Sequence, residues 1–141
     1  SMYGNTENAV NALAGKLAQR GVQDIRMYDV SNTHPSFLIS EVWKYSHMVL
    51  ASPTYNMQLY FPMDTLLREL AALNLKNRKA AVIGNHSWAS AALKKMLEHL
   101  NGMKDIEIIG NPLDIRSCLK PEQENLLDEL ADAICASLKA E

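Results

Sequence analysis

Apolar residues recur along this chain with two spacings, one typical of helices and one typical of strands. Recurrence every three or four residues predicts five helices. The first begins near Gly4 or Asn5 and runs to Gly21, where a glycine suits a helix end. The other predicted helices cover residues 37–43, 62–73, 91–100 and 121–138, and two of them open on a proline.

Strand-like stretches lie between the predicted helices. Residues 25–30 alternate, whereas residues 47–52 and 79–84 are nearly continuous apolar runs, typical of parallel strands buried on both faces. The last strand starts at residues 106–109 and can resume at 113–115 after a Gly-Asn-Pro break. At 141 residues, this alternation predicts one α/β domain with a doubly wound, five-stranded parallel sheet in the order 2-1-3-4-5.

The first of these five strands is missing from the sequence. A helix that begins near residue 4 should follow a strand, and in this order that strand is central. We therefore expect the natural polypeptide to continue upstream with an apolar strand of about five residues. The alternative is a genuine fragment, in which another segment fills the gap.

Ligands of doubly wound sheets bind in loops beyond the carboxyl ends of the strands. Three loops are expected at that edge, namely residues 1–6, 52–61 and 84–89. The first precedes a helix, whose unpaired amides can hold a phosphate where glycine allows close approach. No Lys or Arg appears before Lys16, so the donors would be neutral. Because Ser, Asn and Thr are also common helix caps, this loop alone does not decide between a phosphate site and an ordinary cap.

Composition narrows the classes of function. A net charge of −2 without a basic cluster argues against nucleic acid as the main partner. No apolar run is long enough to span a membrane and no signal-peptide pattern opens the chain, so we expect a cytoplasmic protein. Cys118 and Cys135 lie far apart in the sequence, which favours free thiols with a structural role. The four histidines are scattered singly, and no metal site is predicted.

With the three loops taken together, the chain resembles the flavodoxin family over its whole length. The first loop, Ser1-Met2-Tyr3-Gly4-Asn5-Thr6-Glu7, is similar to the family's FMN-phosphate loop. The second, Ser52-Pro53-Thr54-Tyr55-Asn56-Met57-Gln58-Leu59-Tyr60-Phe61-Pro62, looks more like the flavodoxin domain of A-type flavodiiron proteins, which reduce oxygen or nitric oxide. The third loop of that branch usually reads glycine, serine, aromatic, glycine, tryptophan. Here it is Gly84-Asn85-His86-Ser87-Trp88, which agrees at the glycine and the tryptophan only.

The resemblance implies FMN, bound without a covalent link, and electron transfer. It places these residues at the cofactor: Ser1, Met2, Tyr3, Gly4, Asn5, Thr6, Pro53, Thr54, Tyr55, Asn56, Met57, Gly84, Asn85, His86, Ser87 and Trp88. It implies no catalytic side chain, because the cofactor carries the redox step.

The residues also suit a flavin physically, since its ring needs aromatic faces and backbone donors at its polar edge. Trp88 and Tyr55 can supply the faces, although each alone would be read as a core residue or an exposed turn residue. His86 either tunes the flavin potential with pH or is a solvated loop histidine. An apolar rim either docks a partner or packs under its own loop. The rim consists of Met57, Leu59, Tyr60 and Phe61.

Three functions compete. The first is an FMN electron-transfer domain, either free with a redox partner protein or fused to a diiron domain; a homodimer is compatible with both. The second is an FMN-dependent NAD(P)H:quinone reductase of the same fold, for which no nicotinamide-pocket residues stand out. The third is a non-redox receiver module. A receiver needs an acidic cluster at strand ends, whereas these strands end in Val30, Ser52 and Gly84.

Overall fold

Helices and strands alternate along the chain, as the sequence predicts. The structure is a computed structural model that describes residues 5–55, 57–86 and 90–140. Its elements in chain order are α1 (Asn5–Gln19), α2 (Pro35–Lys44), β1 (His47–Tyr55), β2 (Gln58–Leu59), α3 (Phe61–Ala72), β3 (Lys76–His86), α4 (Ala92–Asn101), β4 (Lys104–Ile108), β5 (Leu113–Arg116), the 3₁₀ turn η2 (Pro121–Gln123) and α5 (Glu124–Lys139). The predicted helices are confirmed, and α1 begins at Asn5.

β3 lies at the centre of a mostly parallel sheet and pairs with β1, β4 and β5. Residues 47–53 of β1 pair in parallel with residues 79–85 of β3. β4 and β5 both pair in parallel with β3, β4 with its first part and β5 with its last part. They are the two halves of the interrupted last strand, separated where Gly110 adopts a φ of 64°. The short β2 was not predicted; it pairs antiparallel with Thr54 and Tyr55 at the end of β1.

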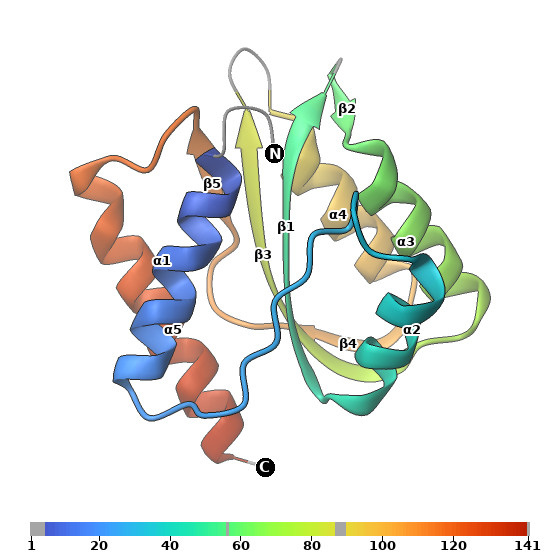
Figure 1. The fold of residues 1–141 in the computed structure, drawn as a ribbon, viewed down its shortest axis with the longest axis horizontal. Helices are drawn as coiled ribbons and strands as arrows, with labels where there is room; N and C mark the ends of the chain where they lie inside the picture. Colours follow the sequence, from blue (N-terminus) through green and yellow to red (C-terminus); the bar gives the residue numbers. More distant parts are fainter. Residues whose placement is uncertain (1–4, 56, 87–89, 141) are drawn as a thin grey trace.

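Helices cover both faces of this sheet (Figure 1). α1 and α5 lie on one face, and α2, α3 and α4 lie on the other. Side chains of β1 alternate between the two resulting cores: Met48 and Leu50 pack toward α2, α3 and α4, and Val49 and Ala51 toward α1 and α5. The doubly wound α/β architecture is therefore confirmed.

The strand predicted over residues 25–30 is wrong. The segment keeps a strand-like alternation, because Ile25 packs into the core under α1 and α5 and Val30 into the opposite core. However, the backbone between Asp24 and Tyr28 makes no hydrogen bond to any other described backbone group. Alternation decides which face a side chain takes, whereas a strand also needs a hydrogen-bonded neighbour. The described part of the chain begins with α1 and holds no strand ahead of that helix.

Candidate functional site

The three predicted loops converge at one edge of the sheet. The carboxyl ends of β1 and β3 lie at the same edge as the amino end of α1 (Figure 1). Pairing of Pro53 with Asn85 in the β1–β3 ladder sets the second loop beside the third. The side-chain amide of Asn85 donates a hydrogen bond to the Thr6 hydroxyl at 3.3 Å, which ties the third loop to the first turn of α1. The structure thus brings together the described parts of all three loops.

Asn85 is the centre of this junction. Its side chain is buried, and the amide nitrogen also donates to the carbonyl oxygen of Ser117 at 3.0 Å. The N–H of Ser117 donates in turn to the carbonyl of His86 at 2.7 Å. The Thr6 side chain is buried as well; its oxygen accepts from Asn85, and no described residue accepts the hydroxyl proton.

Thr54 caps a helix at this edge. Its hydroxyl oxygen accepts hydrogen bonds from the backbone N–H groups of Ala91, at 3.2 Å, and Ala92, at 2.9 Å, where α4 begins. These amides would otherwise lack a partner within the helix. These two amides at the start of α4 are therefore paired within the protein, and contact between Thr54 and a cofactor stays a prediction.

Close packing of β3 against α4 explains why residue 84 is a glycine. A Cβ added at Gly84 would stand 2.8 Å from the Leu93 Cβ and 2.9 Å from the Leu93 backbone nitrogen. Only glycine fits this contact without a shift of the helix. The flavin contact that the sequence predicts for Gly84 stays a prediction.

His86 is held in place by an acidic side chain that sequence reasoning missed. Its Nδ1 lies 3.1 Å from a carboxylate oxygen of Asp114 on β5, and the Ser90 hydroxyl donates to the other oxygen at 2.6 Å. With 16% of its side chain exposed, His86 ends a strand and is not the solvated loop histidine that the sequence allowed. Asp114 could have been found, because it is the one charged residue in the apolar stretch 113–115.

The second loop exposes apolar side chains at this edge. Tyr55 is 49% exposed, Met57 72% and Phe61 76%, whereas Leu59 is buried. Met57 adopts a φ of 59°, as expected in the two-residue turn of a hairpin in which Tyr55 pairs with Gln58. The predicted rim is therefore split, with Leu59 in the core, Tyr60 half-buried, and Met57 and Phe61 at the surface.

Part of the predicted site lies outside the described residues. The structure gives no account of Ser1, Met2, Tyr3, Gly4, Asn56, Ser87 and Trp88, and Asn5 is described only as the first residue of α1. Among the residues that are described, no three His, Cys, Asp or Glu side chains are grouped to hold a metal ion. No described helix has the length and apolar character needed to cross a bilayer.

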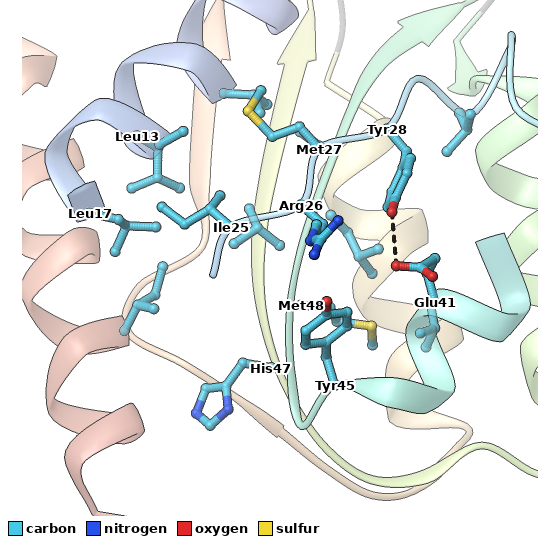
Figure 2. A pocket seen from close by; sticks show the side chains of 18 of the residues that line it. Leu13, Leu17, Ile25, Arg26, Met27, Tyr28, Glu41, Tyr45, His47 and Met48 are labelled. Carbon is cyan, nitrogen blue, oxygen red and sulfur yellow. Dashed lines mark hydrogen bonds between the residues drawn. The ribbon is translucent and has the colours of Figure 1, made fainter. Parts of the chain in front are cut away.

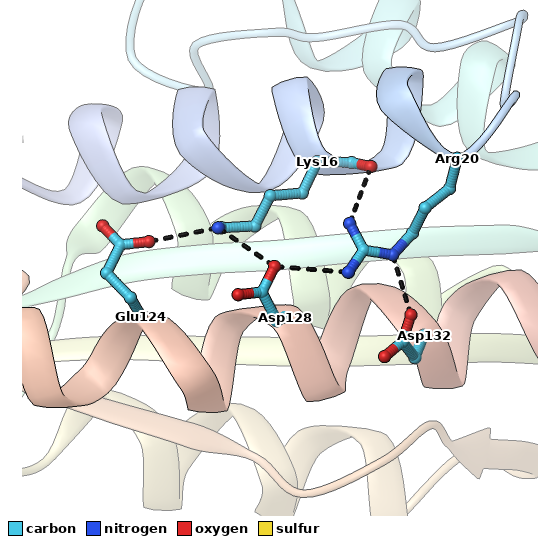
Figure 3. A network of polar contacts seen from close by, with 5 residues as sticks. All are labelled: Lys16, Arg20, Glu124, Asp128 and Asp132. Carbon is cyan, nitrogen blue, oxygen red and sulfur yellow. Dashed lines mark hydrogen bonds and ion pairs between the residues drawn. The ribbon is translucent and has the colours of Figure 1, made fainter.

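An ionic network holds α1 against α5 (Figure 3). Lys16 lies 3.1 Å from Glu124 and 3.0 Å from Asp128, and Arg20 lies 3.2 Å from Asp128 and 2.8 Å from Asp132. The hydrogen bond from Lys16, followed by that from Arg20, lowers the pKa of Asp128. The network fixes the helix whose amino end faces the candidate site.

Comparison with known proteins gives one consistent family. A family model described as flavodoxin matches residues 1–133. The flavo-diiron protein FprA2 of Clostridium acetobutylicum is 30% identical over 105 residues, which cover 74% of this chain and 26% of that protein. The curated rubredoxin-oxygen oxidoreductase of Megalodesulfovibrio gigas is 23% identical over 140 residues, 34% of its length.

Solved structures share the fold. A rubredoxin oxygen:oxidoreductase from Desulfovibrio gigas matches with a TM-score of 0.90 at 23% identity, over 99% of this chain and 34% of that one. A flavodoxin from the domain Archaea matches with a TM-score of 0.82 at 19% identity, over 99% of this chain and 94% of that one. The chain spans roughly a quarter to a third of the length of the curated relatives it matches, 26% and 34% in the two cases above.

Proposed function

This chain belongs to the flavodoxin family, and we propose that it transfers electrons through FMN held at the sheet edge where its three loops converge. The observation that carries the proposal is the hydrogen bond from Asn85 to Thr6. It fixes the first turn of α1, which suits a phosphate, beside the end of β3, which suits the flavin ring. Bound FMN supplies the redox chemistry, and the protein binds and orients it.

The donor set at the start of α1 fits a phosphate. α1 is 15 residues long, so the first N–H groups at its amino end have no partner inside the helix, and that end carries a partial positive charge. The buried Thr6 hydroxyl keeps a proton to donate there. The first basic side chain in the sequence, Lys16, is engaged with α5, so this end of α1 would hold the anion with neutral donors.

The exposed aromatic side chain at the same edge suits the flavin ring. Tyr55 is 49% exposed, so its ring is accessible to a flavin. We propose that Trp88 covers the opposite face and that the backbone around Asn85 and His86 meets the polar edge of the ring. The remaining predicted contacts are Ser1, Met2, Tyr3, Gly4, Asn5, Pro53, Thr54, Asn56, Met57, Gly84 and Ser87.

We further propose that this is the flavodoxin domain of a longer flavodiiron protein, to whose metal-binding domain it passes electrons. The match to about a third of a rubredoxin oxygen:oxidoreductase supports this proposal, and the near-complete match to an archaeal flavodoxin supports a free protein with a separate redox partner. In either form we propose a cytoplasmic, single-domain unit over residues 1–141 that can form homodimers. The coding sequence upstream of residue 1 would distinguish these two forms, because a domain rich in His, Asp and Glu belongs to the first form only. Neither the relatives nor the described residues favour a quinone reductase.

The test is identification of the bound flavin. The purified chain is saturated with FMN or FAD, excess flavin is removed, and the visible spectrum is recorded with far-ultraviolet circular dichroism as the control for folding. We expect a yellow protein that releases FMN with acid and does not retain FAD, because no second glycine-rich turn exists for a pyrophosphate. A folded protein that stays colourless, or that retains FAD instead, contradicts the proposal.

A further inference from the structure

His86 and Asp114 form an imidazole–carboxylate pair at the edge where the three loops converge. Nδ1 of His86, the last residue of β3, lies 3.1 Å from one carboxylate oxygen of Asp114 on β5. In the parallel β3–β5 ladder, Asp114 stands beside Gly84 and Arg116 stands beside His86. Residues 86, 114 and 116 therefore project from one face of the sheet, the face on which Leu93 of α4 packs against Gly84.

The contacts of Asp114 favour one tautomer of the His86 imidazole. The Ser90 hydroxyl donates to the second carboxylate oxygen at 2.6 Å, so both oxygens of Asp114 act as acceptors. A carboxylate beside Nδ1 favours the form that carries its proton on Nδ1. Nε2 then carries the lone pair, and it has no hydrogen-bond partner among the described residues. With 16% of the side chain exposed, the ring can exchange a proton with water at Nε2.

The backbone of His86 is fixed at the junction that carries the proposed FMN site. Its carbonyl accepts a hydrogen bond from the N–H of Ser117 at 2.7 Å. The side chain of the preceding residue, Asn85, joins Ser117 to Thr6 in the first turn of α1. A charge that appears on a ligand bound at this junction therefore acts on the imidazole at short range, where salt screens it little.

Asp114 is the charged group in direct contact with the imidazole. The other charged or titratable residues at this edge are exposed, namely Glu7 in the first turn of α1, Tyr55 at the end of β1, Lys94 in the first turn of α4 and Arg116 at the end of β5. Arg116 and Lys94 oppose protonation of His86, whereas Asp114 and Glu7 favour it. Because exposed charges are screened by water, the contact with Asp114 outweighs them.

Other carboxylates and imidazoles are engaged away from this junction. A cavity of about 530 Å³ lies along β1, and its buried carboxylate, Glu41, accepts hydrogen bonds from Tyr28 and Lys44 at 2.8 Å each (Figure 2). Between α4 and α3, Nε2 of His99 lies 2.7 Å from a carboxylate oxygen of Asp64. His99 is in the last turn of α4, whereas the loops converge where that helix starts. This second imidazole–carboxylate pair therefore provides a matched control.

We propose that Asp114 positions His86 as a proton-binding group for the flavin, which takes up a proton at Nε2 when bound FMN is reduced and releases it on oxidation. This rests on the FMN site proposed above. Two-electron reduction with uptake of one proton leaves a negative charge on the ring, and that charge favours the imidazolium. The electrons come from an external reductant and stay on the flavin, and both protons come from water.

The coupling is reciprocal, so a protonated His86 makes reduction of the flavin easier at low pH. The flavodiiron branch that the third loop resembles has an aromatic residue where this chain has His86. The proton site is therefore expected of this chain and not of that branch in general. Asp114 acts through His86 and is a positioning residue.

The test uses the FMN-loaded chain and three variants between about pH 5 and 9. His86→Asn keeps a side-chain donor for Asp114 but does not titrate, Asp114→Asn removes the anion, and His99→Gln is the control. The protonation of His86 is followed by NMR in the oxidised and the dithionite-reduced protein. The two-electron midpoint potential is measured by spectroelectrochemistry. Far-ultraviolet circular dichroism and flavin absorbance show that each variant is folded and loaded.

We expect His86 to bind its proton about tenfold more tightly once the flavin is reduced. At low pH the midpoint potential should therefore lie about 30 mV above that of His86→Asn, the equivalent of tenfold for two electrons, and the two should converge at high pH. In Asp114→Asn, proton binding by His86 should weaken about tenfold in both oxidation states, and imidazole nitrogen shifts should report a mixture of tautomers. His99→Gln should match the unchanged protein.

Three results would overturn this proposal. Equal proton affinity of His86 in both oxidation states shows that no coupling exists, and this measurement decides even if a variant does not fold. Equal potentials of His86→Asn and the unchanged protein at every pH show that another group takes the proton. An unaltered His86 titration and tautomer in Asp114→Asn show that Asp114 does not position the ring. Each of these leaves FMN binding intact, whereas a folded chain that binds no FMN contradicts both proposals.

Discussion

Asn85 links two loops through a single buried side chain, so its removal should affect both stability and cofactor binding. In Asn85→Ala, the carbonyl of Ser117 and the hydroxyl of Thr6 lose the donor that they share. A buried polar group left unpaired costs about 1–3 kcal/mol, and we expect the free energy of unfolding to fall by that amount. FMN affinity should fall about tenfold, because the first turn of α1 is no longer fixed. Denaturant unfolding and flavin-fluorescence titration measure the two effects.

The control is Asn111→Ala, since Asn111 is an exposed asparagine between β4 and β5. This substitution should change neither the free energy of unfolding nor the FMN affinity. Unchanged FMN affinity in the Asn85 variant would show that the first loop holds its position without this hydrogen bond.

Two glycines should respond in opposite directions to the same substitution. A Cβ at Gly84 meets Leu93 at 2.8 Å, whereas a Cβ at Gly15, inside α1, meets nothing within 4 Å. We expect Gly84→Ala to lower the free energy of unfolding by about 1–3 kcal/mol through overpacking. Gly15→Ala should raise it by about 0.4–1 kcal/mol, because alanine restricts the unfolded chain and favours helix. Thermal unfolding of both variants checks the pair, and a neutral Gly84 variant would mean that α4 shifts freely.

At the scale of elements, the ionic network between α1 and α5 predicts a specific acid sensitivity. Hydrogen bonds from Lys16 and then Arg20 hold the pKa of Asp128 below its ordinary value. The folded state thus binds this proton less readily than the unfolded state, so the contribution is present above the unfolded pKa of about 4 and is lost as pH falls through the lower folded pKa. Asp128→Asn should unfold less steeply with falling pH between about 5 and 2.

Glu129→Gln is the matched control for that variant, because Glu129 is the next residue of α5 and is exposed. Its acid profile should follow the unchanged protein. High salt should also reduce the difference between Asp128→Asn and the unchanged protein, because these side chains are partly exposed and therefore screened. Identical acid profiles for all three proteins would show that the ion pairs of this network do not contribute to the free energy of unfolding.

The sequence predicted helices and strands correctly wherever the pattern of apolar side chains alone determines them. Periodic apolar positions gave the helices, and continuous apolar runs gave the cores of β1 and β3. The pattern failed at residues 25–30, because alternation survives where no backbone partner completes a ladder. The apolar pattern also missed the first residues of β3, Lys76 to Arg78. Their side chains are polar, yet their backbone pairs with β4. Pairing is a property of two segments, and a single segment does not encode it.

At the scale of the whole molecule, the sequence predicted which loops meet at one edge of the sheet but not which residues link them there. The rule that ligands bind beyond the carboxyl ends of strands correctly brought Thr6, Thr54 and Asn85 to one edge. The same rule says nothing of Ser117 or Asp114, which reach this edge because β5 pairs with the last residues of β3. Contacts between distant segments depend on register, which the sequence leaves open.

If FMN binds at this edge, as proposed above, it should stabilise the entire fold, since the edge joins α1, β1 and β3. A ligand that binds only the folded state at a hundred times its Kd adds about 2.7 kcal/mol to the free energy of unfolding. FMN should therefore raise the unfolding midpoint in a concentration-dependent manner. Riboflavin carries the same ring without the phosphate, so at equal concentration it should raise the midpoint much less if the start of α1 holds the phosphate. Equal shifts with both flavins, measured by differential scanning calorimetry, would place the binding energy in the ring alone and remove the phosphate site from the amino end of α1.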